Sequence, residues 1–253
     1  AMSMVHRGKY QGDTVVLKKT SLVGMFAVDR AKLLKAFATE LTIMTQLHSP
    51  RIVSVIGAIT VDSSYLGLVL EYCEGGTLRE ALAVDDYATA VDEAQRRRWL
   101  LDVTLGMSYL YSKGVEHRDL KTLNVLLDAS RRRCKVSDFG LSQSESLNTA
   151  ATQSTMGRDG GAKGTPAYMA PELLDSNTFT EETDVYAYAL VIWEVLTGDI
   201  PWRGLNPVQV AMQILTKQAR PAVPEGAPAD LVALMVRCWA HEPDARPNFA
   251  AIK

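Results

Sequence analysis

The chain has 253 residues and a formal net charge of −2, with 47% hydrophobic and 22% charged residues. Chains of this length fold as one or two domains, and this composition excludes a fibrous or largely disordered protein. The slightly negative charge argues against a broad nucleic-acid footprint, because neutralising many phosphates needs a strongly basic surface.

The N-terminal part of the sequence predicts two strands followed by a helix. Residues 5–19 read as two strands joined by a tight turn, because glycines punctuate the start and a β-branched run follows at residues 15–17. Four apolar residues then recur at helical spacing and predict one face of a helix: Leu33, Phe37, Leu41 and Met44. We expect this helix to stop at residues 48–50, because the residue before Pro50 avoids the α region.

Two further strands lead to a boundary between lobes. These strands are predicted over residues 52–59 and 65–72, and the Gly75-Gly76 pair marks the loop after them. We therefore expect a smaller N-terminal lobe over residues 1–72 and a larger C-terminal lobe over residues 74–253.

The larger lobe is predicted to be mainly helical. Two amphipathic helices are marked by apolar residues: Trp99, Val103, Met107 and Leu110 in the first, and Leu231, Leu234, Met235 and Cys238 in the second. Residues 184–196 are apolar on nearly all sides, which predicts a buried helix. Short strands are predicted at residues 125–127 and 134–136. Residues 141–164 form a polar segment of a length that is usually functional or mobile inside a domain.

Arginine and cysteine usage adds two expectations. The arginine runs at residues 96–98 and 131–133 read as solvated faces or turns rather than as a binding patch. The three cysteines are few and far apart, which favours a reducing compartment, and we expect a cytoplasmic protein without disulfides. No apolar run reaches the ~18–20 residues of a membrane span, and the N-terminus has no signal-peptide pattern.

The strongest chemical signal is the segment 117–124, with the sequence HRDLKTLN. Asp119 and Asn124 lie on a predicted loop that leads into an apolar strand, so both side chains can converge on one point. The carboxylate can orient a hydroxyl and accept its proton, and the amide oxygen can hold a divalent cation. A surface loop of mixed charge is the alternative.

A second motif, VSDFG, follows at residues 136–140. Asp138 stands at the end of a short strand, where a carboxylate can present a hard oxygen ligand to Mg²⁺. An Asp-Phe-Gly tripeptide alone is a weak signal, but its interval from the first motif makes the combination specific.

With these two motifs the chain resembles a eukaryotic protein kinase domain over nearly its whole length. The resemblance implies an α+β, bilobal fold, with a small β-rich N-lobe containing one main helix and a larger, mostly helical C-lobe. It also implies ATP as phosphoryl donor and Mg²⁺ as metal. Asp119 matches the catalytic aspartate of the family, and Asn124 and Asp138 match its two metal-holding positions.

Other residues match supporting positions of the same family. Lys18, which ends the sequence VVLK, matches the phosphate-binding lysine, and Glu40 matches the ion-pair partner of that lysine. Asp184 resembles the aspartate that braces the catalytic loop. Glu172, in the sequence GTPAYMAPE, is expected to pair with Arg246 as a structural contact.

The resemblance also implies an adenine pocket. Six residues match its positions: Val5, Val16 and Leu126 around the ring, Leu70 as the gatekeeper behind it, and Glu71 and Cys73 in the hinge, whose backbone groups bond the purine edge. The same residues are also expected to belong to core strands. A leucine at position 70 is expected to narrow the pocket behind the adenine.

Lys121 favours serine and threonine hydroxyls of proteins as substrates. The resemblance implies that a lysine two residues after the catalytic aspartate lies beside the transferred phosphate in serine/threonine kinases. The sequence is most similar to the tyrosine-kinase-like group, which includes mixed-lineage and Raf-type kinases. Arg118 suggests control by a phosphate on residues 141–164, added by an upstream kinase or by another copy of the chain. The candidate acceptors are Thr149, Thr152, Ser154 and Thr155.

Two departures from the family pattern leave alternatives open. The glycine-rich phosphate loop is nearly absent, since Val5 aligns with the valine that follows it and Ser3 with its last glycine. Val16 replaces the more usual alanine. A pseudokinase that binds nucleotides or partners without catalysis is therefore one alternative. A small-molecule kinase is another, although residues 164–172 resemble a platform for protein substrates.

Overall fold

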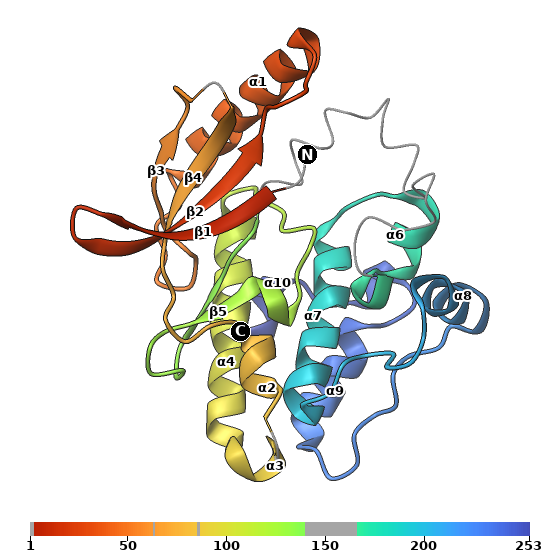
Figure 1. Ribbon diagram of the computed structural model, residues 1–253. Coiled ribbons are helices and arrows are strands. Elements are labelled where there is room, and N and C mark those ends of the chain that lie inside the picture. The colour runs from red at the N-terminus through yellow and green to blue at the C-terminus, as the bar shows by residue number, and fades with distance from the viewer. Residues whose placement is uncertain (1–2, 63, 85–86, 140–165) are drawn as a thin grey trace.

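The computed structural model describes residues 3–62, 64–84, 87–139 and 166–253 of the chain. A four-stranded antiparallel sheet forms its N-terminal part, with the strand order β1-β2-β4-β3 (Figure 1). The strands are β1 (Ser3–Tyr10), β2 (Asp13–Ser21), β3 (Val55–Ile59) and β4 (Tyr65–Glu71). Gln11 and Gly12 join β1 to β2 with positive φ angles, which confirms the predicted hairpin.

Helix α1 (Ala27–Met44) lies beside this sheet (Figure 1). Phe37 and Met44 are buried, and Leu33 and Leu41 pack against the same core, so the predicted apolar face is confirmed.

The end of α1 differs from the prediction. The helix stops at Met44, several residues before the predicted stop at residues 48–50. The Thr45 hydroxyl donates to the Leu41 carbonyl at 2.9 Å, and the His48 amide donates to the Tyr109 hydroxyl at 2.8 Å. The contact with Tyr109 fixes the path of the chain before Pro50 can constrain it.

The C-terminal part is mainly helical, which confirms the predicted α+β class (Figure 1). Its longer helices are α4 (Glu93–Ser112), α7 (Glu181–Thr197), α8 (Pro207–Lys217) and α9 (Ala229–Cys238). Its shorter helices are α2 (Leu78–Leu82), α3 (Tyr87–Ala90), α6 (Pro171–Ser176) and α10 (Phe249–Ile252). Single 3₁₀ turns cover Thr122–Asn124, Pro166–Tyr168 and Pro243–Ala245.

Helix α7 forms the centre of this helical part. Every side chain from residue 183 to residue 196 is buried, as its apolar sequence predicts. The predicted apolar residues of α4 and most of those of α9 are buried as well: Trp99, Val103, Met107, Leu110, Leu231, Met235 and Cys238, with Leu234 packed against the core. The patterns noted above do not predict α8, because only Val210 and Ile214 of that helix are buried.

A short antiparallel ribbon, β5 (Val125–Leu127) and β6 (Cys134–Val136), lies next to α4, and both strands match their predicted bounds. Helix α4 approaches it closely at Gly106. A Cβ atom at this position would lie 2.9 Å from the Arg51 carbonyl oxygen and 3.0 Å from a Val136 methyl carbon. The absence of a side chain therefore permits this packing.

The predicted arginine turn at residues 131–133 includes one residue with a specific ion-pair partner. The Arg133 guanidinium donates two hydrogen bonds of 2.9 Å to Asp102, which is buried on α4 and also pairs with Arg51 at 2.6 Å. A buried carboxylate needs such partners to offset its lost hydration. The run nevertheless lies in a surface turn, as predicted, and the Arg133 side chain is 40% exposed.

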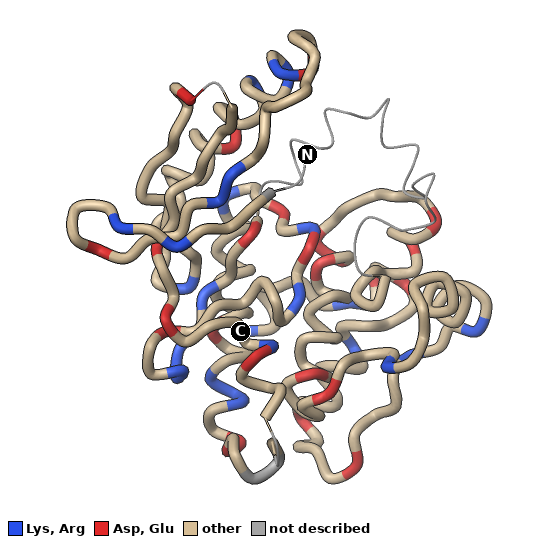
Figure 2. The backbone as a smooth tube through the Cα atoms, viewed as in Figure 1, with Lys and Arg blue, Asp and Glu red and all other residues tan. Residues whose placement is uncertain are grey.

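Charges of both signs are mixed along the chain (Figure 2). Within the described ranges, no helix combines the length and the apolar character needed to traverse a bilayer.

Candidate active site

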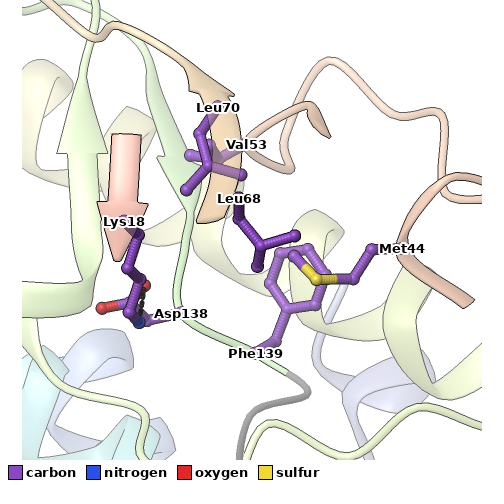
Figure 3. A pocket seen from close by; sticks show the side chains of 7 residues that line it. All are labelled: Lys18, Met44, Val53, Leu68, Leu70, Asp138 and Phe139. Carbon is purple, nitrogen blue, oxygen red and sulfur yellow. Dashed lines mark hydrogen bonds and ion pairs between the residues drawn. The ribbon is translucent and has the colours of Figure 1, made fainter. Parts of the chain in front are cut away.

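The site lies where the N-terminal sheet meets the β5–β6 ribbon. Lys18, on β2, forms a 2.9 Å ion pair with Asp138, which lies two residues after the end of β6 (Figure 3). The Lys18 side chain is 13% exposed and that of Asp138 is 41% exposed, so the pair borders an open cleft. A pocket beside the pair is lined by Met44, Val53, Leu68, Leu70 and Phe139 (Figure 3).

Strand pairing places the predicted adenine residues on one face of the sheet. Val5 and Leu68 are the cross-strand partners of Lys18, and Val16 is the partner of Leu70. Directly paired residues share a face, as do alternate residues of one strand, so all five point the same way. The Val5 side chain is exposed, whereas Leu70 is buried and lines the pocket behind the cleft.

The remaining predicted adenine residues lie at the base of this face. Leu126, on β5, is half-buried and bridges to Thr77 in the segment after β4. Cys73 is also half-buried, and its carbonyl accepts a hydrogen bond from the Gly76 amide at 3.4 Å. Burial raises the pKa of the Cys73 thiol to about 11.

The Glu71 side chain lies on the opposite face from Leu70. Its carboxylate pairs with Lys135 of β6 at 2.6 Å and accepts a 2.7 Å hydrogen bond from the Ser54 amide. Only the backbone of Glu71 can therefore face a ligand in the cleft, which agrees with the backbone role expected for the hinge.

A second cluster surrounds Asp119. The Lys121 ammonium donates to both of its carboxylate oxygens, at 2.7 and 2.9 Å. The Asn124 amide nitrogen donates to the same side chain at 3.0 Å and to the Asp119 carbonyl at 2.7 Å. The Asp119 side chain is 46% exposed, so one face of the carboxylate can receive a hydroxyl group.

Hydrogen bonds to Ser137 join the two clusters. Val125 pairs with Val136 across the ribbon, so Asn124 and Ser137 lie at the same end of it. The Asn124 carbonyl accepts bonds from the Ser137 amide at 2.8 Å and from its hydroxyl at 2.9 Å. The His117 ring contacts the Ser137 carbonyl at 2.9 Å. The loop that carries Asp119 and the segment that carries Asp138 thus meet at one end of the ribbon.

The oxygen donors of this site fit a magnesium ion. The Asn124 amide nitrogen points to Asp119, and its Oδ1 accepts no hydrogen bond from any described residue. Asp138 adds an exposed carboxylate. No group of three or more His, Cys, Asp or Glu residues with metal-site geometry occurs in the described ranges. Mg²⁺ prefers few protein oxygens together with phosphate and water, which matches two ligands of this kind.

Glu40 is buried near Lys18 but does not form the predicted ion pair. Glu40 is 5% exposed, and its Oε1 has no hydrogen-bond partner among the described residues. The Lys18 ammonium lies more than 4 Å from its carboxylate. Burial raises the pKa of Glu40 to about 7, an effect that Lys18 partly offsets. Lys18 pairs instead with Asp138, whose side chain is 41% exposed.

Two buried ion and hydrogen-bond sets support the site. Arg246 forms a bidentate pair with Glu172, at 2.6 and 2.9 Å, as predicted. Asp184 accepts the backbone amides of His117 and Arg118 at 2.8 and 2.9 Å, which agrees with its predicted bracing role.

Glu194 is a supporting residue that the sequence patterns did not single out. It is fully buried on α7 and binds Arg79 of α2, the Thr122 hydroxyl beside the Asp119 loop, and the Tyr168 hydroxyl. Burial raises the pKa of its carboxyl, and these partners lower it. A charged residue inside an otherwise apolar helix was the available signal, since a buried charge requires partners.

Several predicted features lie outside the described residues. They are Gly140, the polar segment 141–164 with its candidate phosphate acceptors Thr149, Thr152, Ser154 and Thr155, and the start of the segment at residues 164 and 165.

Known proteins resemble this chain over nearly its whole length. The family described as protein tyrosine and serine/threonine kinase matches residues 1–253. A probable serine/threonine-protein kinase of Dictyostelium discoideum is 35% identical over 249 residues, which are 98% of this chain and 26% of that protein. The serine/threonine/tyrosine-protein kinase HT1 of Arabidopsis thaliana is 36% identical over 253 residues, 100% of this chain and 62% of that protein.

Human mitogen-activated protein kinase kinase kinase 11 is 31% identical over 258 residues, covering 98% of this chain and 29% of that protein. The chain thus spans between 26% and 62% of the length of these three relatives.

Proposed function

Because the chain belongs to the protein tyrosine and serine/threonine kinase family, we propose that it transfers the γ-phosphoryl group of ATP to serine or threonine hydroxyls of other proteins. The observation that carries the proposal is the meeting of two clusters at one end of the β5–β6 ribbon. Lys18 and Asp138 form one cluster, and Asp119, with Lys121 and Asn124, forms the other.

Each side chain has a role in this proposal. The Asp119 carboxylate orients the substrate hydroxyl and accepts its proton as the oxygen bonds to the γ-phosphorus, while the bond to the leaving ADP oxygen breaks. Lys121, 2.7 Å from Asp119, offsets the negative charge of the transferring group. Lys18 orients the phosphates. Val5, Val16, Leu70 and Leu126 contact the adenine, with the backbone of residues 71–73 at its edge.

Mg²⁺ is the proposed metal. Asn124 and Asp138 would hold it, and when bound it would neutralise phosphate charge during transfer. Glu40 is proposed to support Lys18 in the nucleotide complex. The division into an N-lobe over residues 1–72 and a C-lobe over residues 74–253 belongs to the same proposal. The change from strands to helices after Glu71 supports it.

The test is phosphorylation of a generic protein substrate by the purified chain with Mg²⁺ and ATP, followed by analysis of the phosphorylated amino acids. We expect phosphoserine and phosphothreonine. Phosphotyrosine as the main product would contradict the substrate class, for which the Lys121–Asp119 contact is the supporting observation.

Asp119→Asn is the decisive variant. It keeps the shape of the side chain but removes the proton acceptor, so we expect about 100- to 10,000-fold slower transfer with nucleotide affinity nearly unchanged. Retained turnover would refute the assignment of Asp119. An inactive wild-type chain that still binds nucleotide would favour the pseudokinase alternative.

Control by phosphorylation of residues 141–164 is part of the proposal. The Arg118 guanidinium, which pairs with Glu116 at 2.8 Å and lies over the Phe179 ring, is a candidate partner for the phosphate. An upstream kinase or a second copy of the chain would add it. Phosphosite mapping by mass spectrometry, before and after incubation with ATP, tests this; a fully active chain without phosphate in this segment would contradict it.

A cytoplasmic location is proposed as well. The three free cysteines, Cys73, Cys134 and Cys238, fit a reducing compartment.

A further inference from the structure

Tyr111, near the end of α4, contacts the aspartate that braces the catalytic loop. Its hydroxyl donates a 2.6 Å hydrogen bond to Oδ2 of Asp184, a residue that is only 3% exposed. The same oxygen accepts the His117 amide at 2.8 Å, and Oδ1 accepts the Arg118 amide at 2.9 Å. Three donors thus fix the orientation of one carboxylate.

The backbone that Asp184 holds is strained. Arg118 has a φ angle of +67°, in the left-handed region that residues with a side chain rarely adopt. Such a conformation persists only where surrounding contacts impose it. Arg118 directly precedes Asp119, so the direction of the Asp184 carboxylate influences where the proton-accepting side chain points.

The Tyr111 ring is itself supported by the last helix of the chain. The Phe249 ring, on α10, stacks on it with a centroid distance of 5.8 Å and an interplanar angle of 19°. The Phe249 amide donates to the Glu181 carboxylate at 2.7 Å, and Tyr188 packs against the other side of the cluster at 5.7 Å. Helix α10 is therefore connected to the catalytic loop through two aromatic rings and one carboxylate.

We propose that Tyr111, backed by Phe249, is a positioning residue for phosphoryl transfer: its hydroxyl orients Asp184, which in turn holds the strained backbone in front of Asp119. The inference rests on the proposed kinase function. The competing interpretation is that Tyr111 only fills space between α4, α7 and α10.

The groups that face Asp184 define the expected pH effect. They are the Tyr111 hydroxyl, the His117 ring and amide, and the Arg118 amide, with Glu116 and Glu181 near the tyrosine. The Tyr111 hydrogen bond favours the ionised carboxylate, so its loss raises the pKa of Asp184. A protonated Asp184 accepts the two amides less well. Without the hydroxyl, activity is therefore lost at a higher pH as the solution is acidified.

The experiment compares Tyr111→Phe with Tyr188→Phe in the full chain, together with the wild type. Tyr188 is a matched control, because it is buried in the same aromatic cluster and its hydroxyl bonds only to Thr104 and Leu100 among the described residues. We expect Tyr111→Phe to lower kcat about tenfold, with KM values for ATP and protein within about twofold, and to move the acid limb of kcat upward by about one pH unit. Tyr188→Phe should leave kcat and the acid limb unchanged while lowering thermal stability.

Each possible result of this experiment either supports or contradicts the positioning role of Tyr111. If Tyr111→Phe keeps the wild-type kcat and pH profile, or if Tyr188→Phe reproduces its effects, the tyrosine is a packing residue and the proposal is wrong. If Tyr111→Phe does not fold, Phe249→Leu decides, because it removes the ring that backs Tyr111 and so loosens the hydrogen bond of its hydroxyl to Asp184. A lower kcat together with an acid limb moved to higher pH supports the proposal. A wild-type kcat, or a lower kcat with an unmoved acid limb, overturns it. An inactive wild type would instead refute the kinase function itself.

Discussion

At the scale of single residues, the site contains a buried carboxyl group, that of Glu40, which is not paired with the nearby Lys18. Glu40 has an oxygen without a hydrogen-bond partner and a pKa raised to about 7, whereas Lys18 is engaged with Asp138. Ionising a buried group costs free energy unless a counter-charge approaches it. Glu40 is therefore expected to gain or lose its proton near neutral pH.

We expect the stability of the fold to depend on pH through Glu40. Its pKa is higher in the folded chain, so the folded state binds the proton more tightly, and this contribution to stability is lost as the pH rises from about 4.5 to about 7. Glu40→Gln removes this dependence and should become more stable than the wild type by up to about 3 kcal/mol near neutral pH. Urea denaturation across this range measures it.

Glu225→Gln, at an exposed loop position, is the control and should show no such trend. If the free energies of unfolding of the wild type and of Glu40→Gln change in parallel across this pH range, the prediction is wrong and the Glu40 carboxyl is hydrated.

At the scale of elements, the connection between the sheet and the helical part carries an ion pair of its own. Glu71, at the end of β4, bonds Lys135 of β6 and the Ser54 amide before β3. Both side chains are about three-quarters buried, with exposures of 26% and 28%. Such a pair is expected to contribute more than an exposed one, because water screens it less.

A double-mutant cycle with Lys135→Met and Glu71→Gln is expected to give a coupling energy of roughly 1 kcal/mol in the free energy of unfolding. The matched control is the exposed pair Arg203 and Asp199, with side-chain exposures of 67% and 44%, for which we expect no measurable coupling. Equal coupling in the two cycles would mean that burial at the hinge does not strengthen the interaction.

At the scale of the whole molecule, nucleotide binding should stabilise the fold because the proposed site joins both parts of the chain. Mg²⁺ and ATP at 100 times the dissociation constant contribute ~2.7 kcal/mol, which raises Tm by about 5–10 °C for a chain of this size. Asp119→Asn should keep this shift, whereas Asp138→Asn should lose most of it. Calorimetric scans of the three proteins with and without nucleotide measure it; an equal shift in Asp138→Asn would exclude that residue as a metal ligand.

Local patterns in the sequence predict much of this architecture. The β1–β2 hairpin, α1, α4, α7 and the β5–β6 ribbon all follow from apolar spacing and turn residues. The positions of Asp119, Asn124 and Asp138 at one end of the ribbon follow from two short motifs. Family likeness, rather than periodicity, placed Lys18 with them.

Features that depend on tertiary contacts could not be predicted from such patterns. The early end of α1 reflects the bond from His48 to Tyr109, and the ion pair of Arg133 reflects the position of Asp102 on α4. The pairing of Lys18 with Asp138 rather than with Glu40 depends on where the tertiary fold places the two carboxyls. The spacing of residues in the sequence contains no information on which carboxyl lies closer to Lys18.

Because Lys18 and Asp138 form a 2.9 Å ion pair, Asp138 competes with the phosphates of a nucleotide for the Lys18 ammonium. A triphosphate arriving alone would meet repulsion from this carboxylate and an ammonium already engaged. A divalent cation held by the Asp138 carboxylate would remove both obstacles at once. Affinities for metal and for nucleotide should therefore rise together, each ligand strengthening the other by the same factor, as thermodynamic linkage requires.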